Sequence, residues 1–534
     1  MIAARFSGLA ARAARSFAKA PRPAVAGVEL NAMAPSLWPA DAGFLAEWAD
    51  GRLGLGGVSV PLEGRSPLDI RDAPTAWHEA LYGFGWLRHV PAAARGDAAL
   101  RVDAVLVGWL RDGASRSRHA DADPVKARRA LSWLAHADVL LQTDNGAHYD
   151  RVLTALSAEI QGLERRWRQM DQAGARILAL MAIAEGSLCI AGLAPLQEEA
   201  ETGLAHELSQ RRAPALVGLL RKPDVLAGLI LDMEALRLLY KMRLLPVPGF
   251  LLEALARFTG TLAGLQHGDG SLARLGSARL DAESRLTLAA VRRHVGLPAA
   301  LQCHDQAAGY ARLALGDACV IIDAGAPLGN VHALALEMSS GAAPMLVHDG
   351  VEGAPQRGHA TLVLTPDAAR PDTCATLPEY WPNLEAAHNI DVALADPAIQ
   401  SVDATHAGPA RNGFVHRRRV TLEQNGRLLS GIDDLRPLVS QAAPANSGFA
   451  ARFVLHPGVV VGVPDAQDRV DLTLPNGHRW TLSAAGQTLS VEGALYRDGP
   501  RTVPTLQILV LSGDEPSRSV TWQLQRDDGD TSTS

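Results

Sequence analysis

Residues 250–270, FLLEALARFTGTLAGLQHGDG, divide the sequence into two parts that follow different patterns. Before the HGDG stretch, apolar residues recur three and four positions apart, which is typical of helices that bury one face. After it, short runs of β-branched and other apolar residues alternate with turn residues, which is typical of antiparallel strands. The sequence therefore predicts a helical half followed by a β-rich half, with the change near His267.

The helical half consists of successive amphipathic segments. The clearest are 150–168, 174–191, 196–211, 225–243 and 250–266. We expect Asp150 to cap the first segment, because aspartate is a favoured N-cap residue. Gly192 and Pro195 separate two segments, and Pro246 and Pro248 end another. Segments of this length with short connections predict an array of antiparallel helical hairpins.

The β-rich half contains short strand-like runs. They include ACVIIDA (318–324), ATLVLT (360–365), RRVTLEQ (418–424) and RVDLTL (469–474). Asn-Gly pairs at 425–426 and 476–477 are strong signals for hairpin turns, because both residues tolerate a positive φ. After about residue 300 the sequence therefore predicts antiparallel β-structure, most economically a large sandwich.

Composition narrows the class of protein. Of the 534 residues, 47% are hydrophobic and 20% are charged, which is typical of a globular protein. The formal net charge of −6 gives no overall positive electrostatic field that would attract nucleic acid. The four cysteines form no CxxC pair, which argues against a zinc ribbon or a dense disulfide framework. No uncharged apolar run is long enough to predict a transmembrane helix.

The first 25 residues are basic. They contain Arg5, Arg12, Arg15, Lys19 and Arg22 and no acidic residue. The arginines interrupt the apolar residues, so this stretch lacks the continuous apolar region of a secretory signal. It predicts a basic N-terminal helix, with a helix lying on a membrane surface as the alternative.

Nine short motifs resemble, in the same order, those of bacterial heparinase II/III-like proteins. They lie at 77–89, 267–272, 309–313, 332–338, 359–362, 413–419, 453–458, 474–477 and 507–511. The resemblance implies an α+β multidomain fold, in which an incomplete α/α toroid precedes a large antiparallel β-sandwich. The expected limits are an N-terminal extension 1–74, a toroid 75–270, a linker 271–299, a β-sandwich 300–515 and a tail 516–534.

The resemblance also implies a polysaccharide lyase that cleaves an anionic, uronate-containing polysaccharide by β-elimination, in the periplasm. A cytoplasmic location is the alternative, because a clear signal peptide is lacking. The reaction needs neutralisation of the C6 carboxylate, a base for the C5 proton and an acid for O4. The candidate catalytic residues are Tyr310, His332 and His359, with Asn330 hydrogen-bonded to the carboxylate.

The helical half departs from the family pattern. The family places Asp-Gly-Gly-His on a loop where this chain has Ala215-Leu216-Val217-Gly218, and Val225 stands near the expected Tyr. Such residues offer no titratable group for acid–base work. The alternative is therefore a catalytically weakened glycan-binding or envelope-polysaccharide-associated protein, and a purely structural interaction protein is a third possibility. We expect weak or absent lyase activity.

Some family members carry a zinc site, and four residues fall in the matching motifs. They are His332, His348, Asp349 and His359, and imidazole and carboxylate are suitable zinc ligands. The alternative is ordinary hydrogen-bonded histidines on strands. Arg417, Arg418 and Arg419 are a candidate basic lip, although neighbouring residues of a strand point to opposite faces and a solvated edge is equally consistent. For His267 and Asp269, a helix cap and linker is the simpler interpretation.

Overall fold

The computed structural model describes residues 28–91, 96–112, 117–141, 146–210, 216, 219–274, 281–300, 303–305, 308–325, 334–349, 362–365, 388–406, 414–437, 448–465, 468–499, 501–511 and 519–527. The chain divides into two compact units. Unit 1 comprises Met1–Ser209 and Ala235–Leu251, and unit 2 comprises Gln210–Glu234 and Leu252–Ser534. The domain limits expected from the sequence stay a prediction. The N-terminal segment 1–25 lies outside the described residues.

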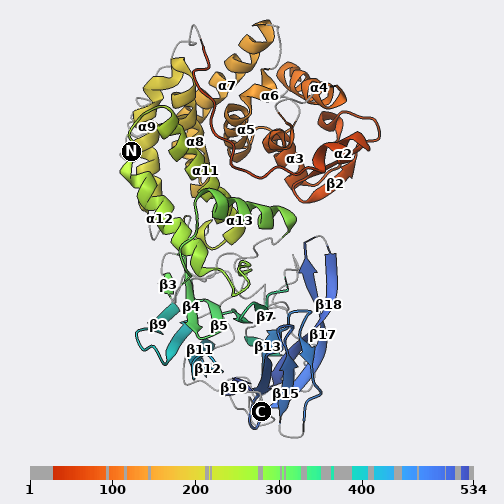
Figure 1. Cartoon of the computed structure of the whole chain (residues 1–534), viewed down its shortest axis with the longest axis vertical. Helices are drawn as coiled ribbons and strands as arrows, with labels where there is room; N and C mark the ends of the chain where they lie inside the picture. The colour runs from red at the N-terminus through yellow and green to blue at the C-terminus, as the bar shows by residue number, and fades with distance from the viewer. Residues whose placement is uncertain are drawn as a thin grey trace, which may run out of the picture. The chain divides into compact units, whose positions relative to one another are not determined.

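Helices form the first half of the chain, shown in red to green in Figure 1. They are α2 (Phe44–Ala49), α3 (Thr75–Tyr82), α4 (Asp97–Asp112), α5 (Asp123–Ala135), α6 (Ala137–Leu140), α7 (Gly146–Arg166), α8 (Ala173–Cys189), α9 (Gln197–Ser209), α11 (Pro223–Met242), α12 (Gly249–Gly264) and α13 (Ala282–His294), with a small hairpin of β1 (Arg52–Leu55) and β2 (Val58–Pro61). The five predicted helical segments are confirmed. The predicted cap at Asp150 is wrong, because α7 begins at Gly146. Its buried face extends back to His148, which requires another turn of helix.

Helix α8 is the centre of unit 1. Its residues are buried on nearly every side, and it packs against α5, α7 and α9. Two glycines permit the close approach: a Cβ atom at Gly186 would stand 2.6 Å from the Ile160 side chain, and one at Gly203 would stand 2.6 Å from Leu180. A helix that is apolar all round must be covered on all sides, so the other helices assemble around α8.

Strands dominate the described residues after 300. They are β3 (Cys303–Asp305), β4 (Tyr310–Leu315), β5 (Ala318–Asp323), β6 (Leu336–Ser340), β7 (Ala343–Leu346), β8 (Leu362–Thr365), β9 (His388–Ala393), β10 (Gln400–His406), β11 (Phe414–Glu423), β12 (Leu428–Pro437), β13 (Gly448–Val454), β14 (Val460–Val461), β15 (Arg469–Thr473), β16 (Arg479–Ser483), β17 (Thr488–Asp498), β18 (Arg501–Leu511) and β19 (Ser519–Arg526). The predicted change from helices to strands is confirmed. The expected linker 271–299 contains α13.

The strands of the second half pair into three antiparallel sheets within the described residues. Their orders are β14-β15-β16-β19-β12-β11-β10-β9, β17-β18-β13-β8 and β3-β4-β5-β6-β7. Both predicted Asn-Gly hairpins are confirmed, since β11 pairs with β12 and β15 with β16. Gly426 and Gly477 adopt the positive φ that such turns require. Strand β19 joins β12 to β16, a pairing between segments far apart in sequence.

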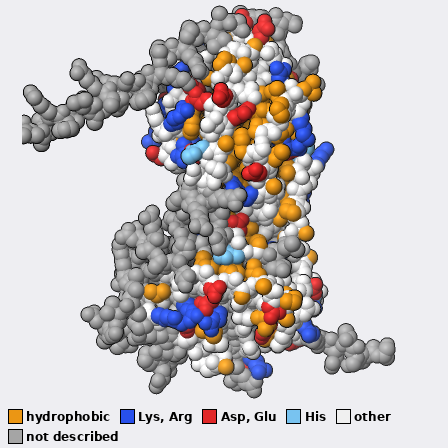
Figure 2. All heavy atoms as spheres, turned by 90° about the vertical axis from the view of Figure 1, so that its left-hand side faces the viewer, with side chains coloured by type: hydrophobic (Ala, Val, Ile, Leu, Met, Phe, Trp, Pro, Cys, Tyr) orange, Lys and Arg blue, Asp and Glu red, His pale blue; other side chains and the backbone are white. Residues whose placement is uncertain are grey.

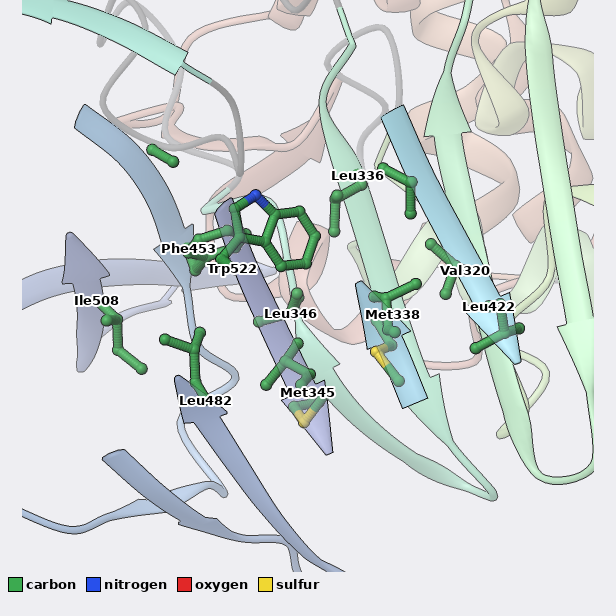
Figure 3. Packing of buried hydrophobic residues seen from close by; sticks show 14 of the residues in the cluster. Val320, Leu336, Met338, Met345, Leu346, Leu422, Phe453, Leu482, Ile508 and Trp522 are labelled. Carbon is green, nitrogen blue, oxygen red and sulfur yellow. The ribbon is translucent and has the colours of Figure 1, made fainter. Parts of the chain in front are cut away.

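The eight-stranded sheet packs face to face with the other two sheets. Their inward side chains form one apolar core, with Val320 and Met338 from one side, Leu422 and Trp522 from the eight-stranded sheet, and Phe453 from the third. Figure 3 shows these side chains meeting between the layers. Strand β10 alternates buried and half-buried residues, as a sandwich requires. The predicted antiparallel sandwich is confirmed.

The five-stranded sheet is buried on both faces. One face carries the apolar residues that join the core, and the other carries polar side chains that contact the segment around α12. This arrangement explains why β5 is buried at every position. The polar face is the part of unit 2 that brings distant titratable residues together.

Among the described residues, no helix is both long and apolar enough to cross a membrane.

Candidate functional site

The polar face of the five-stranded sheet bonds to the main chain at the C-terminal end of α12 and just after it. Tyr310 donates its hydroxyl hydrogen to the Thr261 carbonyl oxygen over 2.8 Å, and Arg312 donates to the carbonyl oxygens of Gly264 and Gln266. Carbonyl groups at a helix C-terminus have no partners within the helix. The sheet supplies those partners and thereby fixes the position of the HGDG turn.

His267 of this turn forms a buried ion pair with Glu337 of β6. Its Nε2 atom lies 3.0 Å from Glu337 Oε2. Burial disfavours the charged ring, but the Cys319 thiol and the Glu337 carboxylate outweigh burial and raise the pKa of His267 to about 10. The interpretation of His267 as part of a simple cap and linker is therefore incomplete, because the ring is buried against Glu337 and its pKa is raised. Asp269 remains exposed and closes the turn by accepting from Ser271.

Glu337 also positions Arg274. The second carboxylate oxygen accepts the backbone N–H of Arg274 over 2.7 Å. The buried guanidinium donates to the Arg497 carbonyl oxygen over 2.6 Å and to the Tyr496 hydroxyl oxygen over 2.9 Å. It also lies 4.3 Å from the centre of the Tyr496 ring, a cation–π distance. Arg274 is therefore directed at the phenol of β17.

Tyr496 and His456 form the accessible end of this group. Both side chains are half-buried, and their ring centres are 5.4 Å apart in an edge-to-face arrangement. His456 Nδ1 accepts the Gly458 backbone N–H over 3.1 Å, which assigns the ring proton to Nε2. Burial and then the charge of Arg274 lower the pKa of His456. The ring is therefore neutral at neutral pH and carries an N–H that can donate.

The pKa of the Tyr496 phenol reflects two opposing influences. Burial raises the pKa, and the neighbouring Arg274 guanidinium opposes that rise. A phenol beside a cation can act as a base when it loses its proton and as an acid when it regains it. We call Arg274, His456 and Tyr496 the Tyr496 cluster. It combines a proton-transfer group, a fixed cation and a neutral N–H donor.

Tyr310 occupies a different environment. Its side chain is fully buried, and its hydroxyl group is engaged with the Thr261 carbonyl and lies 3.9 Å from Cys303 Sγ. Burial raises its pKa far above the usual range. These contacts favour a packing role, and its predicted role as base stays untested. Asn330, His332 and His359 lie outside the described residues, so their predicted roles also stay predictions.

Two of the four candidate zinc ligands are described. His348 and Asp349 are both buried, with 3.5 Å between His348 Nδ1 and Asp349 Oδ1. Two ligand atoms each about 2.1 Å from a tetrahedral zinc lie roughly 3.4 Å apart, so this spacing fits a shared ion. The described residues alone contain no group of three metal-binding side chains, and the other two candidates are outside them. The backbone oxygen of Asp349 accepts from Arg274 and Arg497, which places the pair beside the Tyr496 cluster.

The three consecutive arginines of β11 separate as strand alternation predicts. Arg417 and Arg419 both pair with Asp403 of β10 on one face. Arg418 points into the sandwich and donates twice to the buried carboxylate of Asp433. The alternative of a solvated sheet edge is wrong, because β11 is an interior strand between β10 and β12.

Asp433 is the centre of a second buried network, which the sequence did not indicate. Besides Arg418, its carboxylate accepts from His416 and Trp522, and His416 in turn bonds to His406 over 3.0 Å. The Arg418 guanidinium and the hydrogen bond from His416 hold the pKa of Asp433 below its usual range although burial opposes this. Burial lowers the pKa of both histidines. The network is enclosed within the sandwich, so we interpret it as structural.

Comparison with known proteins identifies a family that the β-rich half resembles. Residues 304–525 match the family model described as Heparinase II/III-like, C-terminal. These residues therefore resemble the C-terminal domain of heparinase II/III-like proteins. No curated protein sequence matches the chain.

Solved structures extend the similarity to the whole heparinase-like fold. A crystal structure of heparinase III is 12% identical, with a TM-score of 0.70, and the match covers 98% of this chain and 90% of that one. A heparan sulfate lyase HepC mutant from Pedobacter heparinus is also 12% identical, with a TM-score of 0.60 and coverage of 98% and 88%. The predicted fold, a helical toroid followed by a β-sandwich, is confirmed.

Sequence reasoning missed the Tyr496 cluster. His456 lies in the FVLHPG motif that contributed to the resemblance, and Arg274 follows the HGDGSL motif by two residues, so proximity to these motifs was an available signal. Tyr496 has no such signal, because it stands in an ordinary strand pattern. Only the pairing of β17 and β18 and the position of the HGDG turn bring the three residues together.

Proposed function

We propose that this protein is a polysaccharide lyase that cleaves an anionic, uronate-containing polysaccharide by β-elimination at the Tyr496 cluster. One observation carries the proposal: an accessible phenol accepts a hydrogen bond from a buried guanidinium and lies beside a neutral imidazole. The similarity to heparinase-type structures supports the reaction class.

Each residue of the cluster has one task in the proposed reaction. The Nε2–H of His456 donates to the C6 carboxylate and makes the C5 hydrogen more acidic. The phenolate of Tyr496 removes the C5 proton, and the electron pair left at C5 forms the C4–C5 double bond as the C4–O4 bond breaks. The Tyr496 hydroxyl then returns this proton to the departing O4. Protons and electrons balance without another reactant.

Arg274 acts through Tyr496. Its guanidinium is buried and already donates to three acceptors of the protein, so it does not need to contact the substrate. A fixed positive charge at hydrogen-bond distance stabilises the phenolate relative to the phenol. Glu337 and His267 hold the Arg274 backbone in place. We therefore assign Arg274 as a positioning residue.

A zinc ion is part of this proposal. His348 and Asp349 would hold it together with His332 and His359, and the separation of the first two supports this. When bound, such an ion supplies a fixed positive charge and ties strand ends together. No step of the proposed elimination depends on it.

A glycan-binding protein with little or no activity is the second candidate function. The apolar stretch of the helical half favours it, because Leu216 is buried where the family pattern would place Asp-Gly-Gly-His. In this case the Tyr496 cluster would bind the uronate without turnover.

Turnover assays on the full-length protein separate these functions. The ultraviolet absorbance of the unsaturated uronate product is followed with heparan, hyaluronan, alginate and bacterial exopolysaccharides. We expect Tyr496→Phe to lower turnover by about 10²–10⁴-fold while Tyr310→Phe retains it. Loss of turnover in Tyr310→Phe but not in Tyr496→Phe would instead assign the role of base to Tyr310. Binding of a polysaccharide without turnover would establish the second candidate.

We propose that the protein acts in the periplasm, as the family resemblance implies. Fractionation of cells that produce the tagged full-length chain tests it. A pool found only in the cytosol would contradict both the location and an extracellular polysaccharide as substrate.

A further inference from the structure

The C-terminal end of α11 and its connection to α12 expose apolar side chains to solvent. Leu244 is 92% exposed, Met242 is 59% exposed, and Leu245 is also exposed. Hydrophobic side chains are visible on the surface of the helical region in Figure 2. Single exposed leucines are common on proteins, but three within four residues at the tip of one connection need a reason.

The backbone makes the exposure of Leu244 more unusual. Leu244 has a φ of +55° and occupies the position directly after the helix end, where glycine is strongly preferred. The Leu245 N–H bonds to the Tyr240 carbonyl oxygen and the Leu244 N–H to the Lys241 carbonyl oxygen, which completes a Schellman motif. Leucine in this backbone region is strained, and its side chain contacts almost nothing. Glycine would satisfy the same hydrogen bonds without strain, so folding does not account for leucine here.

The charges beside these residues indicate the partner. Lys241 and Arg243 are exposed on either side of Met242, and the stretch 235–252 contains no acidic residue. Exposed apolar side chains interleaved with lysine and arginine match an anionic lipid surface, with acyl chains below and negatively charged headgroups above. We propose that residues 241–245 form a loop that inserts into anionic membranes and docks the protein at their surface.

Vesicle binding tests this proposal with the full-length protein. Co-sedimentation is measured with vesicles of phosphatidylglycerol and phosphatidylcholine and with phosphatidylcholine alone. We expect binding to the anionic vesicles only. Leu244→Gly should weaken it about tenfold, because one leucine side chain leaves the acyl region. Lys241→Gln and Arg243→Gln should each weaken it roughly fivefold.

Leu244→Gly also distinguishes a loss of vesicle binding from a loss of folding. Leu244→Gly relieves the strained backbone, so its unfolding midpoint should equal or exceed that of the wild type. Val463→Ser is the matched control, because Val463 is 89% exposed in unit 2 and should not affect vesicle binding. Wild-type binding that Leu244→Gly leaves unchanged would assign the lipid contact to another segment, such as the basic residues 1–25, and overturn the proposal. Self-association abolished by Leu244→Gly, without vesicle binding, would overturn it in favour of a second copy as partner.

Discussion

The substitution Glu337→Gln tests how much the buried pair of His267 and Glu337 stabilises the protein. The wild-type carboxylate accepts from His267 and from the Arg274 backbone, and all three residues are buried. Glutamine keeps the shape but removes the charge that stabilises the imidazolium. Breaking a buried pair by removing one charge typically costs about 3–5 kcal/mol. At pH 6 we therefore expect the free energy of unfolding of Glu337→Gln to be about 3–5 kcal/mol lower than that of the wild type.

The pH dependence gives a sharper test. The pKa of His267 is raised to about 10 in the folded protein from its usual 6.5. The folded state therefore holds a proton that the unfolded state releases above pH 6.5, so stability is full below that pH and falls as the pH rises towards 10. Between pH 6.5 and 9 the decrease is about 3 kcal/mol, at about 1.4 kcal/mol per pH unit.

Denaturant titrations at several pH values, followed by tryptophan fluorescence, measure both effects. The wild type should lose stability over this pH range, and Glu337→Gln should lose much less because its His267 no longer retains the proton. Glu492→Gln is the matched control, since Glu492 is a half-buried strand residue with a weaker hydrogen bond to Gln507. Parallel pH profiles for the wild type and Glu337→Gln would refute the assignment of a charged His267.

Three further predictions concern other parts of unit 2. Asp433→Asn should destabilise the protein by about 3–5 kcal/mol, because it leaves the buried Arg418 guanidinium uncompensated. Asp403→Asn on the half-exposed face should cost about 1 kcal/mol or less. Equal losses of stability in thermal denaturation would be inconsistent with this prediction. Lyase turnover should rise with pH between 7 and 9, because burial raises the pKa of Tyr496 and the reaction uses its phenolate; a rate that falls over this range would exclude Tyr496 as the base. Elemental analysis of purified protein should find about one zinc per chain, lost in His348→Ala, and zinc-free wild-type protein would end the metal proposal.

Much of the fold could be predicted because local patterns and tertiary structure agree. The Asn-Gly pairs specify hairpins through backbone sterics alone, and both hairpins form. Apolar spacing located the helices within a few residues, although it did not reveal that α7 extends back to Gly146. Alternation along β11 predicted opposite faces for its arginines. It could not show that β11 is an interior strand, because strand order depends on pairing between distant segments.

The candidate site was much less predictable. The resemblance directed attention to Tyr310, which the structure places against the α12 carbonyl groups in a fully buried position. A tyrosine at the start of a strand looks the same in sequence whether its hydroxyl faces solvent or a helix end. His267 was interpreted as part of a turn, because nothing near it in sequence indicates that Glu337 lies opposite.

Side-chain periodicity and local backbone preference are enough to predict the order of helices and strands, the hairpin turns and the two-part architecture. The sequence also contains motifs that resemble those of heparinase II/III-like proteins. Which polar groups meet depends on how distant segments pack in the tertiary structure. Arg274, His456 and Tyr496 are separated by 182 and 40 positions in the sequence, and they converge because the polar face of one sheet fixes the HGDG turn beside the end of β17. Hydrogen-bond partners and pKa values depend on distance and burial in three dimensions, and no local pattern encodes them.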